Sequence, residues 1–85
     1  MIRVEAVYGC GDSLTPDVAA KLAQVAERCQ SHLEMECAGK RVMLDSLIGI
    51  LSVPCARGMR LGVVAEGEDE QAAAEAIRDV LEMRS

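Results

Sequence analysis

The side chains best suited to covalent or metal chemistry in this sequence are its four cysteines. They are Cys10, Cys29, Cys37 and Cys55, and no two of them form a CxxC pair. Zinc sites usually contain at least one such close pair, so this spacing argues against bound zinc. Cysteine is also among the residue types most often buried in a core. We therefore expect small apolar core residues or free thiols, with no metal site and no cofactor.

Hydroxyl side chains stand at two positions where the sequence predicts that a helix begins. Thr15 precedes Pro16 and Asp17, and these types suit the N-cap, the first helical position and the positive end of the helix dipole. Ser46 follows Asp45, and either of these two could cap a second helix. A phosphate on such a hydroxyl would meet free backbone amides. Capping alone is the simpler interpretation of both positions.

The strands that must position these residues follow from the apolar pattern. Residues 2–8 and 33–37 alternate apolar and polar side chains, as half-buried strands do. A turn at residues 38–40 predicts a hairpin, with residues 41–44 as its second strand. Residues 59–66 form a fourth strand. Because most strands alternate, we expect an antiparallel sheet that buries one face under the helices and leaves the other wet.

Three stretches show the apolar spacing of amphipathic helices, which makes the element order β-α-β-β-α-β-α. The first follows Thr15, the short second one follows Ser46, and the third follows the carboxylates at residues 68–70. The apolar faces, in chain order, are Val18, Leu22, Val25, Ala26 and Cys29; then Leu47, Ile48 and Leu51; and last Ala73, Ala76, Ile77, Val80 and Leu81.

Composition excludes several classes of function. The chain has 85 residues and a net charge of −5, which opposes binding to nucleic acid or to an anionic membrane. Tyr8 is the only aromatic residue, so a base-stacking platform is not expected. No apolar run approaches the roughly 20 residues of a membrane span, and the charged start does not resemble a signal peptide. We expect one domain over residues 1–85, located in the cytoplasm and without disulfides.

Several short segments resemble the HPr family of the bacterial phosphotransferase system, in an ungapped register over nearly the whole chain. They are Ala19-Ala20, Gly39-Lys40, the run Asp-Ser-Leu-Ile-Gly at residues 45–49, Ala-Arg-Gly at residues 56–58 and Ala-Glu-Gly-Glu-Asp-Glu-Gln at residues 65–71. Their joint spacing carries the match, since each is short. The resemblance implies an α+β, two-layer open-faced sandwich with a four-stranded antiparallel sheet in the order 1-4-2-3 and three helices on one face.

The resemblance also implies a phosphorylation site, which this chain has altered. Family members pass a phosphoryl group from enzyme I to the sugar-specific enzyme II components through a histidine in a Leu-His-x-Arg-Pro-Ala motif. The matching stretch at residues 14–19 is Leu-Thr-Pro-Asp-Val-Ala. Thr15 replaces the histidine and would form a phosphate ester, which is a poor donor. Asp17 replaces the arginine that clamps the phosphate, and would repel it. The only histidine, His32, is expected at the surface near the second strand and not as a substitute acceptor.

Ser46 matches a serine that an ATP-dependent HPr kinase/phosphorylase modifies in many Gram-positive members of the family. Crh, a member without the histidine, keeps this serine and acts only in regulation, and the phosphorylated forms bind the transcription factor catabolite control protein A. The resemblance therefore implies a Crh-like regulatory protein in catabolite repression, not an enzyme. Ser46 is its expected phosphoserine, although Asp45 would disfavour a nearby phosphate, and Leu47, Ile48 and Leu51 are its expected docking residues. We expect a monomer or a weak homodimer.

Other functions stay open on the sequence alone. The chain could be a phosphocarrier in sugar uptake that uses another acceptor, or a scaffold in which Thr15 and Ser46 serve only as caps. By the resemblance, Cys10 and Cys55 border the degenerate phosphocarrier site, where they could form a thiol or metal site. The family also places lysines around its docking face, where this chain has Gln24, Glu27, Asp45 and Gly49. That change of charge predicts different partners.

Overall fold

The order of elements along the chain is β-α-β-β-α-β-α, which confirms the prediction. A computed structural model describes residues 1–9, 14–53 and 56–82. In that part of the chain the elements are β1 (Ile2–Val7), α1 (Pro16–Arg28), β2 (His32–Cys37), β3 (Lys40–Met43), α2 (Leu47–Leu51), β4 (Arg60–Glu66) and α3 (Glu70–Leu81).

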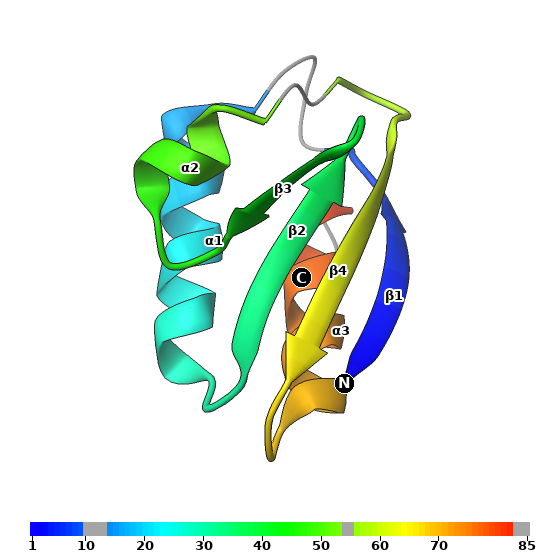
Figure 1. The fold of residues 1–85 in the computed structure, drawn as a ribbon. Coiled ribbons are helices and arrows are strands. Elements are labelled where there is room, and N and C mark those ends of the chain that lie inside the picture. The colour runs from blue at the N-terminus through cyan, green and yellow to red at the C-terminus, as the bar shows by residue number, and fades with distance from the viewer. Residues whose placement is uncertain (10–13, 54–55, 83–85) are drawn as a thin grey trace.

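The strands form a four-stranded sheet in the order β1-β4-β2-β3, and every neighbouring pair is antiparallel. Met35 at the centre of β2 lies opposite Val63 of β4, and both side chains are fully buried. Helices α1 and α3 lie behind the sheet, and α2 lies beside α1 (Figure 1). This is the open-faced sandwich, with the strand order 1-4-2-3, that the resemblance to the HPr family implies.

Strand β4, one of the two inner strands, departs from the alternation of buried and exposed residues expected of the sheet. In β4, every residue from Leu61 to Ala65 is buried, including those that face away from the helices. The side chain of Arg3 covers this outer surface, because a Cβ built on Gly62 would lie 2.5 Å from Arg3 Nη2. Arg3 is in turn paired with Glu36 at 3.4 Å. One face of β4 is therefore buried by the core, and the other by an arginine from β1.

Ion pairs continue across this outer face of the sheet. Arg41 Nη2 lies 3.1 Å from Glu36 Oε2, and Arg41 Nε lies 3.5 Å from Glu34 Oε1. The hydrogen bond from Arg41, followed by the charge of Arg3, holds the pKa of the Glu36 carboxyl below its usual value. The outer face of the sheet is therefore charged and exposed to solvent, except where the side chain of Arg3 covers the middle of β4.

The helices bury somewhat different residues from those predicted. In α1, the most buried residues are Ala19 and Leu22, of which only Leu22 was expected on the apolar face. In α3, Ala74 is fully buried, whereas Ala76 and Val80 are only partly buried. Alanine gives a weak signal of burial, since its small side chain suits both the core and the surface. The predicted faces of α1 and α3 are confirmed at Leu22, Ile77 and Leu81 and are shifted at the alanines. The predicted face of α2 was wrong as a buried face, because its three residues are exposed.

A clamp joins the turn between α1 and β2 to the turn between β4 and α3. Asp69 stands at the N-cap of α3, but its side chain makes no capping hydrogen bond to that helix. Its carboxylate instead accepts from the backbone N–H of Gln30 at 3.0 Å and from the hydroxyl of Ser31. Gly67 lies directly against Ser31, so two turns far apart in sequence are packed together.

Stability at low pH should depend on this clamp. The hydroxyl of Ser31, followed by the N–H of Gln30, holds the pKa of the Asp69 carboxyl below its ordinary value. A carboxyl whose pKa is lower in the folded state than in the unfolded state stabilises the protein at pH values above the unfolded-state pKa of about 3.9. This stabilisation is lost as the pH falls through the folded-state pKa. We expect Asp69→Asn to flatten the acid side of the stability curve, measured by urea unfolding between about pH 5 and pH 2. Asp79→Asn should keep the wild-type slope, and an unchanged slope in Asp69→Asn would contradict the assignment.

Candidate functional site

The start of α1 holds the residues predicted to form the degenerate phosphocarrier site. Thr15 has extended backbone angles, and its Oγ1 accepts from the backbone N–H of Val18 at 3.4 Å. Pro16 occupies the first helical position, and Asp17 is exposed in the first turn. The threonine hydroxyl is therefore engaged as a helix cap, and the nearest formal charge on this turn is negative.

The only imidazole of the chain lies far from this position. His32 is exposed at the first residue of β2, where its Nε2 lies 2.9 Å from Glu34 Oε2. Helix α1 separates it from Thr15, and its 13 residues span about 20 Å. Figure 1 shows α1 beginning at the top of the molecule and ending at the bottom, next to the start of β2. His32 therefore cannot supply an imidazole at the start of α1.

Ser46, and not Asp45, caps the second helix. Its Oγ accepts from the backbone N–H of Gly49 at 3.1 Å, and its carbonyl accepts from Ile50 N–H at 2.9 Å. The serine is exposed. A Cβ built on Gly49 would lie only 3.2 Å from the serine Oγ, so the glycine keeps one side of the hydroxyl open. The predicted modification site is thus an exposed hydroxyl at a helix start.

Helix α2 presents three apolar side chains to solvent directly after this serine. Leu47 is 43% exposed, Ile48 is 83% exposed and Leu51 is 39% exposed, and we call these three the docking patch. Ile50 points the other way and is fully buried. It anchors the helix in the core, and the apolar pattern did not predict its burial, because a helix of five residues is too short to define a period. Neighbouring exposed apolar residues of this size often mark interaction surfaces.

Two of the four cysteines, Cys29 and Cys37, lie in the part of the chain that the structure describes. Cys37 is buried, and Cys29 is partly buried. Burial, followed by the negative charge of Asp69, raises the pKa of the Cys29 thiol, which disfavours the reactive thiolate. Cys10 and Cys55, the pair considered as a thiol or metal site, lie outside the described residues.

The described ranges contain neither a metal-binding cluster nor a helix that could span a membrane. Across residues 1–9, 14–53 and 56–82, no group of three or more His, Cys, Asp or Glu side chains is placed to hold a metal ion. Over the same ranges, no helix has the length and apolar character needed to cross a membrane.

Comparison with known proteins identifies the family. The family model PTS-HPr, described as the PTS HPr component phosphorylation site, matches residues 13–83. The chain belongs to the HPr family. The match confirms the family membership that the short motifs indicate.

Solved HPr structures agree with this assignment over almost the full length. HPr-C-His from Thermoanaerobacter tengcongensis is 30% identical with a TM-score of 0.88, covering 99% of this chain and 94% of that one. The phosphocarrier protein HPr from Bacillus anthracis is 26% identical with a TM-score of 0.87, covering 94% and 95%. Crh from Bacillus subtilis, described as a domain-swapped dimer, is 28% identical with a TM-score of 0.79, covering 99% and 97%. The HPr fold of this chain therefore occurs both in a phosphocarrier protein and in a protein described by its link to catabolite repression.

Proposed function

We propose that this HPr-family protein is a histidine-less, Crh-like regulatory module that acts through phosphorylation of Ser46 and docking to other proteins. One observation carries the proposal: the exposed hydroxyl of Ser46 lies at the start of the helix that presents the docking patch, while its anchor Ile50 is buried. A kinase can reach this hydroxyl, and a partner can contact phosphate and apolar side chains together. The activity is binding and not catalysis.

The start of α1 supports the loss of phosphoryl transfer. The Thr15 hydroxyl caps the helix, and the exposed carboxylate of Asp17 would repel a phosphate placed there. Transfer to another protein needs a labile donor, and a threonine ester is far more stable than the phosphoramidate formed by imidazole. The remaining histidine lies about 20 Å away by helix length. These features favour regulation over a phosphocarrier with an unexpected acceptor.

The start of α2 suits a phosphate better. A phosphoserine carries about −1.5 to −2 charges and three acceptor oxygens, which the free amides of a first helical turn can meet. Gly49 places no Cβ beside the serine oxygen, and its N–H, which donates to that oxygen in the unmodified protein, could donate to a phosphate oxygen instead. The carboxylate of Asp45 lies next in the chain and opposes the phosphate, and because Asp45 is exposed, solvent and salt screen this repulsion.

The partners we propose are proteins found in the cytoplasm. The kinase would be an HPr kinase/phosphorylase, and the phosphorylated form would bind a transcription factor like catabolite control protein A. We propose a single domain over residues 1–85 that is a monomer or a weak homodimer. The swapped dimer of Crh and a dimer of HPr from Thermoanaerobacter tengcongensis, 31% identical to this chain, support self-association as a property of the fold.

Phosphorylation by an HPr kinase and ATP tests this proposal at one residue. Wild-type protein is expected to gain a single phosphate, and Ser46→Ala is expected to gain none. Ser52→Ala is the matched control, because Ser52 stands at the other end of α2, where its hydroxyl donates to the Gly49 carbonyl at 2.7 Å. It should be phosphorylated like the wild type. A phosphate on Ser46→Ala, or no phosphate on the wild type while a bacterial HPr in the same reaction is modified, would overturn the proposal.

A further inference from the structure

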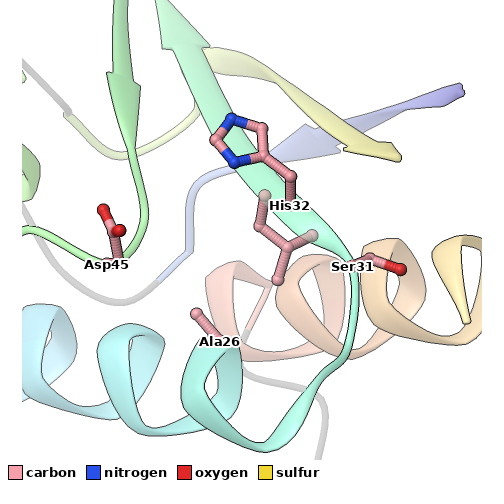
Figure 2. A pocket seen from close by; sticks show the side chains of 5 residues that line it. Ala26, Ser31, His32 and Asp45 are labelled. Carbon is pink, nitrogen blue, oxygen red and sulfur yellow. The ribbon is translucent and has the colours of Figure 1, made fainter. Parts of the chain in front are cut away.

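A small pocket lies on the side of the molecule where α1 ends and β2 begins. Its volume is about 200 Å³, and it is lined by Ala26, Ser31, His32, Leu33 and Asp45 (Figure 2). Asp45 belongs to the segment that leads into α2, so three separate parts of the chain meet here. The pocket is too small for a drug-sized ligand, for which about 300 Å³ is the lower limit, but it has room for a short chain with one head group.

The polar groups of this pocket are acceptors. Asp45 is exposed, and its carboxylate forms no hydrogen bond or ion pair with any residue that the structure describes. The hydroxyl of Ser31 already donates its hydrogen bond to the carboxylate of Asp69. An ionised Glu34 only accepts hydrogen bonds, so His32 Nε2 must carry the proton in the 2.9 Å contact between them. In the neutral ring, Nδ1 then holds a free lone pair.

The unpaired negative charge at the pocket is that of Asp45. Two other carboxylates lie beside lining residues, but each has partners: Asp69 accepts from Ser31 and from the N–H of Gln30. Glu34 is offset by the guanidinium of Arg41, with Nε at 3.5 Å from Oε1. Asp45 has no such partner among the residues that the structure describes. Figure 2 shows the carboxylate of Asp45 and the ring of His32 on two sides of the pocket, with Ala26 at its edge. A positively charged hydrogen-bond donor would therefore complement the acceptors of this pocket.

We propose that this pocket binds a primary ammonium group on a short alkyl stem. The ammonium would donate to the carboxylate of Asp45 and to the free ring nitrogen of His32, and the stem would pack on Ala26 and Leu33. A compact ammonium with three donors suits two separate acceptors better than a planar guanidinium does. The group could come from a free small amine or from a lysine side chain of a partner. This inference does not depend on phosphorylation of Ser46.

Titration with n-butylammonium chloride, followed by NMR, tests the pocket. The chain has one histidine, so the ring of His32 gives a single, unambiguous signal. We expect a saturable shift of that signal and of the amides of Ala26, Leu33 and Asp45. Asp45→Asn should weaken binding about tenfold, which is typical of the loss of a charged hydrogen-bond partner. Asp79→Asn changes a half-exposed aspartate on α3 that does not line the pocket, and this variant should bind like the wild type.

Two reference compounds make the test decisive. Butanol has the same stem without the charge, and sodium chloride has a cation without the stem, so neither should produce the saturable shift. Equal shifts from either compound, or unchanged affinity in a folded Asp45→Asn variant, would overturn the proposal. A parallel titration with N-acetyl-lysine methylamide identifies the source: saturation by this compound too points to a lysine of a partner, and saturation by butylammonium alone points to a free amine.

Discussion

Replacement of Gly67 by alanine is expected to lower the free energy of unfolding by about 3 kcal/mol. The backbone at this residue has φ +154°, which side chains rarely adopt, and a Cβ built there would lie 2.6 Å from Ser31 Cα. The neighbour cannot move aside easily, because Ser31 is only 8% exposed and its hydroxyl is bound to Asp69. Since small domains have about 5–15 kcal/mol of stability in total, this is a large loss.

Two other glycines provide controls for this prediction, with urea unfolding as the measurement. Gly39 also has a positive φ, of +80°, but nothing lies within 4 Å of its Cβ position, so Gly39→Ala should cost only about 1 kcal/mol. At Gly62, the new Cβ would meet the far end of the flexible Arg3 side chain, which can swing away. Gly62→Ala should therefore cost about 1 kcal/mol or less, the worth of exposed ion pairs. A loss at Gly67 no greater than that at Gly39 would contradict the packing described for the clamp.

The two isoleucines of α2 are expected to affect stability and binding in opposite ways. Ile50 is fully buried, so Ile50→Ala should lower the free energy of unfolding by about 3 kcal/mol. Ile48 is mostly exposed, so Ile48→Ala should change stability by no more than about 0.5 kcal/mol. If the docking patch is the binding surface, the same substitution at Ile48 should weaken the phosphorylated protein's affinity for its partner about tenfold.

Urea unfolding measures the first effect, and titration calorimetry with a transcription factor like catabolite control protein A measures the second. Val7→Ala is a suitable control for binding, because Val7 is an exposed apolar residue on β1, away from α2. It should bind the partner like the wild type. Equal losses of affinity in Ile48→Ala and Val7→Ala would show that the patch is not the binding surface.

Much of the fold could be predicted from periodicity. The strands β1 and β2 alternate cleanly, and the capping residues Thr15 and Ser46 mark the starts of α1 and α2. The burial of β4 on both faces could not be predicted, because it depends on Arg3 reaching across from β1. The hydrogen bonds of Asp69 could not be predicted for the same reason. A carboxylate directly before a helix predicts an N-cap, and only the three-dimensional structure places it beside Ser31.

The candidate site was predictable in type but not in detail. Asp45 and Ser46 are both good capping residues, so the sequence could not distinguish them, and the hydrogen bond to Gly49 settles the choice. Likewise, Ile48 and Ile50 are identical in type, and their opposite exposures follow from how α2 packs beside α1. The pocket at Asp45 had no sequence signal, because its lining residues come from three separate segments.

The most direct test of the regulatory role is the intact mass of the protein after two parallel incubations, one with ATP and HPr kinase and the other with phosphoenolpyruvate and enzyme I. A bacterial HPr that carries the histidine serves as the positive control in both reactions. We predict one phosphate in the kinase reaction, located on Ser46 by peptide mapping, and none in the enzyme I reaction. Phosphate accepted from phosphoenolpyruvate would contradict the account, because it would show that the protein is still a phosphocarrier.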